Sequence, residues 1–126
     1  MEALGTVEVV GLVAGVEAAD VACKTADVRL VGYELAKGGG YVTIKVLGQV
    51  GAVHAAVAAA AEAAARISRV VSKLVIPRPS DQIEAMVFNT MTVGHEPEPE
   101  PTPERAGEEA PAPATPANTT TRRKQS

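Results

Sequence analysis

Three consecutive glycines, Gly38 to Gly40, follow Lys37 and separate two short runs of strand-forming residues. The preceding run covers residues 28–34 and the following run covers residues 41–46. Glycine loses more backbone entropy on folding than any other residue, so three in a row require a geometric reason. Either a tight turn needs positive φ angles, or another group must approach the backbone more closely than a Cβ atom allows.

The segments around this hairpin alternate between strand and helix periodicity. Residues 2–10 have the period of a half-buried strand, and residues 12–25 place apolar side chains at helical steps. A second helix is predicted from about 49 to 68, then a strand over 70–76 that prolines end, and a short helix over 80–87. The order β-α-β-β-α-β predicts a ferredoxin-like α+β fold, in which two helices cover one face of an antiparallel sheet.

Helical spacing also predicts which side chains are buried. The expected buried face of the first helix holds Val13, Val16, Ala19 and Cys23. The expected stripe of the second helix holds Val50, Val53, Val57, Ala60, Ala64 and Ile67. On the exposed side of the first helix, Asp20 and Lys24 are spaced for an ion pair. The single cysteine is therefore predicted to be a buried structural thiol, and it fits a reducing cytoplasm.

Composition changes near residue 93. Residues 1–93 carry nine acids and eight bases, whereas residues 94–126 carry six acids, four bases and seven of the nine prolines. The second part has no aromatic or large aliphatic residue, so we predict a disordered, acidic, Pro/Ala/Thr-rich tail after one folded domain. The domain has no basic excess, which weighs against nucleic acid as a partner.

Several function classes find no support in the residues. His54 and His95 are isolated and show no metal-ligand spacing with Cys23, so neither a metal, a cofactor nor a catalytic set is predicted. The glycine run precedes a strand rather than a helix, unlike phosphate-binding loops. The Ala-rich run over 50–67 contains charged residues and is only weakly apolar, so it is predicted not to span a membrane. We therefore expect a protein that is not an enzyme.

Five short motifs in a constant order resemble the bacterial microcompartment shell family, and together they cover nearly all of residues 2–88. They are EALG at 2–5, EAAD at 17–20, LVGYE at 30–34, GQVGAV at 48–53 and VIPRP at 75–79. The resemblance is to the single-domain, hexamer-forming class. It implies a self-assembling homohexamer that tiles with other shell hexamers, trimers and pentamers in the cytoplasm, around encapsulated enzymes.

The resemblance also implies roles for particular residues. Lys37, Gly38, Gly39 and Gly40 would line a central pore for small metabolites. Lys24 and Arg78, with Asp27 nearby, would make contacts at the hexamer edge. Lys37 has two open readings, since it could charge the pore mouth or instead point to solvent or pair with Glu34. The chain departs from the family pattern in three ways. The turn over residues 35–41 is one residue longer than usual, and Gln49 replaces an acidic helix cap, which weakens that helix N-terminus modestly. The acidic Pro-rich tail lies outside the resemblance.

A second class of function stays open at this stage. The domain has no Trp and one Phe, and its core of Ala, Val, Leu and Ile buries little area per residue, which favours self-association. A ferredoxin-like regulatory module that binds a small molecule between subunits would also self-associate. The presence of extended six-fold sheets would distinguish a shell protein from such a module.

Overall fold

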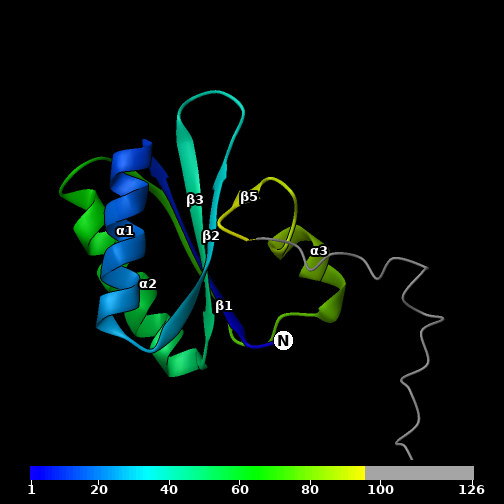
Figure 1. Ribbon diagram of the computed structural model, residues 1–126. Coiled ribbons are helices and arrows are strands. Elements are labelled where there is room, and N and C mark those ends of the chain that lie inside the picture. Colours follow the sequence, from blue (N-terminus) through cyan, green and yellow to red (C-terminus); the bar gives the residue numbers. More distant parts are fainter. Residues whose placement is uncertain (96–126) are drawn as a thin grey trace, which may run out of the picture.

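The structure is a computed structural model that describes residues 1–95. Figure 1 shows a single sheet with two long helices against one face and a short helical segment against the other. Within the described residues the chain forms nine elements. They are β1 (Ala3–Val10), α1 (Leu12–Thr25), β2 (Val28–Leu35), β3 (Tyr41–Gly48), α2 (Val50–Ala65), β4 (Val70–Ile76), η1 (Asp81–Ile83), α3 (Glu84–Val87) and β5 (Thr92–Val93).

The sheet has the strand order β4-β1-β3-β2-β5, and every neighbouring pair is antiparallel. β1 and β3 form its centre, and their register runs without a shift from Ala3 opposite Gly48 to Val10 opposite Tyr41. The predicted α+β order, with two helices on one face of an antiparallel sheet, is confirmed. The predicted tail, residues 94–126, lies outside the described residues except for its first two, so the domain boundary stays a prediction.

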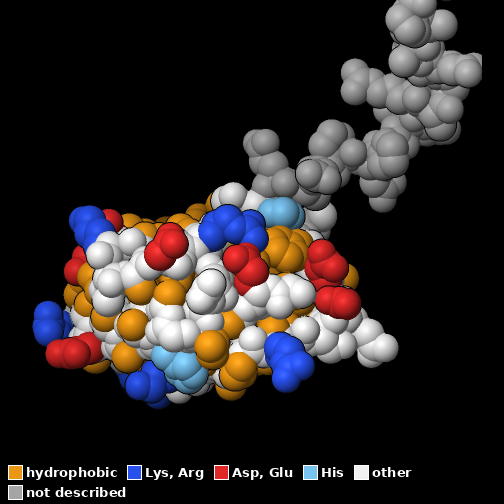
Figure 2. All heavy atoms as spheres, turned by 90° about the horizontal axis from the view of Figure 1, so that it is seen from below, with side chains coloured by type: hydrophobic (Ala, Val, Ile, Leu, Met, Phe, Trp, Pro, Cys, Tyr) orange, Lys and Arg blue, Asp and Glu red, His pale blue; other side chains and the backbone are white. Residues whose placement is uncertain are grey.

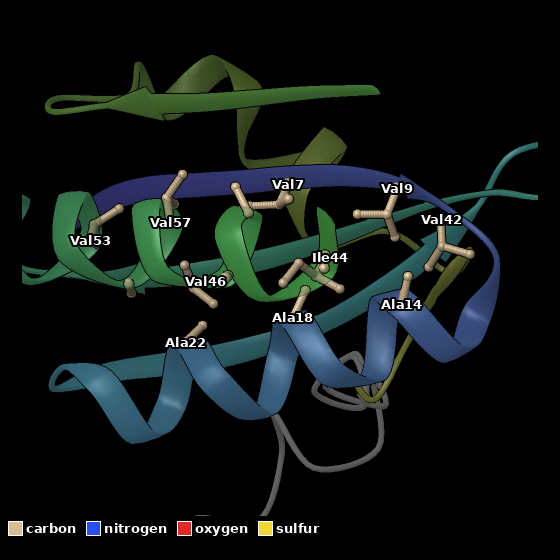
Figure 3. Close-up of a cluster of buried hydrophobic side chains, with 14 of the residues drawn as sticks. Val7, Val9, Ala14, Ala18, Ala22, Val42, Ile44, Val46, Val53 and Val57 are labelled. Carbon is tan, nitrogen blue, oxygen red and sulfur yellow. The ribbon is translucent and has the colours of Figure 1, made fainter. Parts of the chain in front are cut away.

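The main core lies between the sheet and the two long helices. Figure 3 shows valines of the sheet and of α2 meeting small side chains of α1. Gly15, in α1, packs so close to β3 that a Cβ atom there would stand 2.9 Å from a methyl carbon of Val42. Small residues on α1 thus let the helix approach the sheet and α2 closely, which raises packing density without large side chains.

The predicted buried face of α1 is wrong. The helix buries Ala14, Gly15, Ala18 and Ala22, and it exposes Val13 and Val16. Cys23 is exposed as well, so it is not the buried thiol that helical spacing suggested. The buried face lies on a different side of the helix from the predicted one, and the face with the smaller side chains is the one that fits against α2 and β3.

The stripe predicted for α2 is confirmed along its middle. Val53, Val57, Ala60 and Ala64 are buried, whereas Val50 and Ile67 at the two ends are exposed. Gln49 occupies the N-cap position, and its side chain makes no hydrogen bond to the helix.

A second, smaller cluster lies on the other face of the sheet. Leu4, Val31, Leu47 and Val87 are buried there, and partly buried side chains from β4, from η1 and from the residue after α3 pack against them. The short helix begins where predicted, because the Ser80 side chain accepts a hydrogen bond from the Gln82 amide.

The two-residue strand β5 was missed by sequence analysis. It pairs with β2 where Gly32 has a φ of 147° and where a Cβ atom would overlap the Val93 carbonyl oxygen. We call residues 84–93 the C-terminal strap. Its helix α3 packs on β2 and β3 on the face away from α1 and α2, and its strand β5 pairs with the edge of β2.

Candidate functional site

The glycine turn is the tip of the β2–β3 hairpin, which projects beyond the rest of the domain in Figure 1. Gly38, Gly39 and Gly40 have φ angles of 84°, 68° and 70°, so the tight-turn explanation for the glycines holds. The Ala36 amide donates to the Tyr41 carbonyl at 3.0 Å and closes the turn. We call residues 36–41 the glycine loop.

Crowding within one chain does not explain the outer glycines. A Cβ atom at Gly38 or Gly40 would meet nothing within 4 Å, and one at Gly39 would touch the Tyr41 ring at 3.3 Å. The loop is therefore constrained by backbone conformation, and its two open positions leave room for a neighbouring molecule to come close.

Lys37 is exposed, and none of the ion pairs among residues 1–95 includes it. The alternative that Lys37 pairs with Glu34 is wrong, because the Glu34 carboxylate accepts from Lys45 Nζ at 2.7 Å. The ammonium group of Lys37 is thus available to solutes near the loop.

Two corners of the chain hold the loop in place. The Gly11 amide, between β1 and α1, donates to the Gly40 carbonyl at 2.7 Å. Arg69, between α2 and β4, donates from Nη2 to the Tyr41 hydroxyl at 3.3 Å, and its own carbonyl accepts from the Val10 amide at 3.0 Å. Sequence analysis gave Arg69 no role, because 28 positions separate it from Tyr41 and no local pattern relates the two residues.

A buried lysine joins the hairpin to the C-terminal strap. Lys45 is only 6% exposed, and its Nζ donates to Glu34 at 2.7 Å and to the Thr92 hydroxyl at 2.9 Å. The Met86 and Val87 carbonyls also accept from it, at 3.1 and 3.2 Å. The hydrogen bond from Lys45 is the main reason that the pKa of Glu34 lies below its ordinary range. This network was also missed, since a lone Lys in a strand usually faces solvent.

The three predicted edge residues lie at the opposite end of the sheet from the glycine loop. Asp27 directly precedes β2, whose first residue Val28 is opposite Gly48, and Arg78 follows β4, whose last residue is opposite Leu4. Because β3 has eight residues, this outer end lies about 23 Å from the loop end.

The edge residues share that end without bonding to one another. Lys24, Asp27 and Arg78 are all exposed, and none of the hydrogen bonds among residues 1–95 joins two of them. As predicted, Lys24 pairs with Asp20, and its Nζ lies 2.7 Å from Asp20 Oδ2. The hydrogen bond to Asp20 raises the Lys24 pKa above its ordinary value.

The two lateral edges of the sheet carry different apolar surfaces. On the β2 side, an apolar groove of about 230 Å³ runs between α1 and β2, with Leu12, Val16, Ala19, Leu30, Tyr33 and Ile44 in its lining. On the β4 side, Ile67, Val71 and Leu74 are exposed. Figure 2 shows hydrophobic side chains reaching the surface between charged groups on the face that it displays.

Within residues 1–95 the structure brings together no set of catalytic or metal-binding groups. No three His, Cys, Asp or Glu side chains lie close enough to hold a metal ion. His54 and Cys23 are exposed and lie in different helices. No helix in this part of the chain has the length and apolar character needed to cross a bilayer.

The described residues thus form a small α+β domain. It has a hairpin loop at one end of the sheet, polar residues at the other end and apolar surfaces on the two lateral sides. The family model for the BMC domain matches residues 3–79. The chain therefore belongs to the BMC domain family, the bacterial microcompartment family that the five motifs had suggested.

The similar proteins have consistent names. The carboxysome shell protein CsoS1 of Prochlorococcus marinus is 45% identical over 93 residues, which cover 73% of this chain and 89% of that protein. The bacterial microcompartment shell protein PduA of Citrobacter freundii is 51% identical over 86 residues, which cover 68% of this chain and 91% of that protein.

A solved structure of a microcompartment protein has a similar fold. A microcompartment protein from Desulfitobacterium hafniense DCB superimposes with a TM-score of 0.62 at 35% identity, over 67% of this chain and 47% of that one. The present chain thus spans about half the length of that solved chain.

Proposed function

We propose that this chain is a structural shell protein that forms cyclic hexamers, and that these hexamers tile into the facets of a bacterial microcompartment. Its place in the BMC domain family, beside relatives named as shell proteins, is the observation that carries this proposal. The arrangement of the sheet supports the proposal physically, because the glycine loop and the candidate edge residues lie at its opposite ends.

A ring of identical chains requires two different contact surfaces on each chain. Such head-to-tail contacts close into a ring when a whole number of identical rotations completes a full turn with no shift along the axis. The groove between α1 and β2 on one lateral edge, and the exposed apolar residues near β4 on the other, supply two such surfaces. With these faces in contact, the strands of each sheet would run along a radius of the ring. The glycine loops would then meet at the axis, and Lys24, Asp27 and Arg78 would lie at the rim.

The glycine loop has the properties that a pore requires. Six copies near one axis leave little room for side chains, and Gly38, Gly39 and Gly40 offer only backbone N–H and C=O groups to passing metabolites. Lys37 adds up to six positive charges at the mouth, which would favour anions over cations.

At the rim, each candidate residue has a distinct role. The methylene stem of Lys24 would pack along the neighbouring tile, and the Arg78 guanidinium would donate to carbonyls across the junction. Asp27 would accept from the facing edge. Further partners would be other shell hexamers, trimers, pentamers and the enclosed enzymes, in a cytoplasmic shell that itself has no catalytic role and needs no cofactor.

The competing reading, a regulatory module that binds a small molecule, has one observation in its favour, the apolar groove beside Tyr33. Ligand sites normally combine an apolar lining with a few convergent polar groups that orient the ligand. The residues that line this groove are apolar apart from the Tyr33 hydroxyl. The groove therefore suits an apolar surface of a second copy better than a metabolite.

Electron microscopy of the purified protein tests the proposal. We expect extended sheets or tubes of six-fold rings, and we expect Lys24→Ala and Arg78→Ala to leave rings that no longer tile. Arg66→Ala is the control, because Arg66 is equally exposed but lies at the loop end of α2. Discrete dimers or trimers of the wild type would contradict the proposed function. Dissociation of the rings by Lys24→Ala would contradict only the edge assignment.

A further inference from the structure

Arg69 is an exposed cation that contacts the glycine loop. Its guanidinium reaches the Tyr41 hydroxyl, and its carbonyl accepts from Val10 directly before Gly11, whose amide holds the Gly40 carbonyl. Three segments that are distant in the sequence, residues 10–11, 36–41 and 69, therefore converge at the loop end of the sheet.

The contacts place Arg69 behind Tyr41 and Tyr41 beside the middle glycine. The Tyr41 ring lies so near Gly39 that a Cβ atom there would be 3.3 Å from Cε2 and 3.4 Å from Cζ. The hydroxyl on that Cζ atom is the acceptor of Arg69. Arg69 thus restrains the ring that flanks the loop, and with it the side from which Gly39 can be approached.

The charge of Arg69 is not neutralised within residues 1–95. None of the five ion pairs there includes Arg69 or Lys37, whereas Arg66, one turn earlier, is paired with Glu62 at 3.2 Å. Guanidinium carries five N–H donors in a planar fork that matches carboxylate and phosphate oxygens. One donor interacts with Tyr41, and none of the hydrogen bonds among residues 1–95 engages the others.

We infer that Arg69 is a specificity-determining residue of the pore mouth, which adds a second cation per subunit for small oxyanions and positions Tyr41 against the loop. The inference rests on the proposed hexameric pore. In a ring of six, Arg69 and Lys37 together contribute up to twelve positive charges around one opening. The two cations are attached differently, since Lys37 belongs to the glycine loop itself whereas Arg69 reaches the loop through its hydrogen bond to Tyr41.

The reversal potential across planar bilayers that contain purified rings measures anion-to-cation preference in a gradient of potassium phosphate. Six added charges within about one Debye length of the permeating ion, about 8 Å at physiological salt, should change that preference by about three- to tenfold. We expect Arg69→Gln to lower the preference for anions by this factor and Arg69→Lys to keep most of it. The matched control is Arg29→Gln, which removes an exposed arginine at the outer end of the sheet.

Hydrogen exchange of the Gly11 amide measures the positioning role without reference to a pore. Tyr41→Phe removes the acceptor but keeps the ring and all charges, and Arg69→Gln removes the donor. We expect both variants to speed exchange at Gly11 several-fold, because the Gly40 carbonyl that it bonds is no longer steadied. Unchanged exchange in both variants would overturn the positioning role.

The outcomes separate the inference from the function on which it rests. If wild-type rings conduct no ions, the pore itself is absent and the proposed function loses its pore. If the wild type prefers anions and Lys37→Gln lowers that preference, but Arg69→Gln behaves like Arg29→Gln, the pore stands and the role of Arg69 is wrong.

Discussion

Replacing the buried Lys45 with methionine should weaken the fold far more than replacing an exposed lysine. Met matches the length and shape of the lysine stem but donates no hydrogen bond. In the variant, the Glu34 carboxylate loses its cation, and the Thr92 hydroxyl and the Met86 and Val87 carbonyls lose a donor.

The structure bounds the size of the loss. Removing one partner of a buried ion pair costs about 3–5 kcal/mol, because the other charge stays behind without compensation. The Glu34 side chain is 33% exposed, so water and Asn89, which donates to it at 3.3 Å, recover part of that cost. We expect Lys45→Met to lower the free energy of unfolding by about 2–4 kcal/mol.

Lys24→Met is a closely matched control. Lys24 and Lys45 both hold a carboxylate oxygen at 2.7 Å, but the side chain of Lys24 is 73% exposed and that of Lys45 is 8% exposed. An exposed pair contributes little to stability, because water and salt screen it. Urea unfolding followed by circular dichroism, at one fixed protein concentration because ring formation contributes to stability, compares the two variants.

If Lys45→Met and Lys24→Met cost the same, burial does not govern the strength of these pairs in this fold. The double variant Lys45→Met with Glu34→Leu provides a second check, because it removes both charges and should recover at least part of the loss.

Two further predictions follow from the same structure. Since Lys45 lowers the Glu34 pKa in the folded chain, this contribution to stability is complete above the unfolded-state pKa, near the ordinary 4.5, and is lost as pH falls through the lower folded value. Glu34→Gln should therefore flatten the fall in urea midpoint as the pH is lowered below 4.5, and an unchanged fall would show that other carboxylates cause it. Gly39→Leu should slow solute flux through assembled shells, and flux equal to that of the wild type would remove Gly39 from the pore. Because Gly39 has a φ of 68° and a Cβ atom there would touch the Tyr41 ring, the substitution should also lower the free energy of unfolding by about 1–2 kcal/mol, more than its place in an exposed loop suggests.

Much of this fold was predictable because local patterns encode it. The order of strands and helices, the hairpin around the glycines, the middle of the α2 stripe and the Ser80 cap all depend on residues a few positions apart. The pair between Asp20 and Lys24 was predictable for the same reason, since four-residue spacing brings side chains together on any helix. Positive φ at Gly38 to Gly40 follows from the same local logic, because a turn that tight admits few other residues.

The predictions that failed concern where distant segments meet. Helical spacing allowed two buried faces for α1, and only packing against α2 and β3 selected the one with Ala14 and Ala18 over the one with Val13 and Val16. Lys45 has the pattern of an ordinary strand lysine until the C-terminal strap folds over it. The contact from Arg69 to Tyr41 likewise exists only because the sheet places the corner before β4 beside the β2–β3 hairpin.

The sequence by itself determined the element order, the glycine loop and, through five ordered motifs, the BMC domain family. These depend on short-range periodicity and on the chemistry of single residues, which are visible in any stretch of chain. The tertiary structure decided which side of α1 is exposed, where a charged lysine is buried, and that the loop and the candidate edge residues lie at opposite ends of one sheet. Those properties arise from close packing and from desolvation, which depend on all surrounding atoms at once and cannot be read from neighbours in sequence.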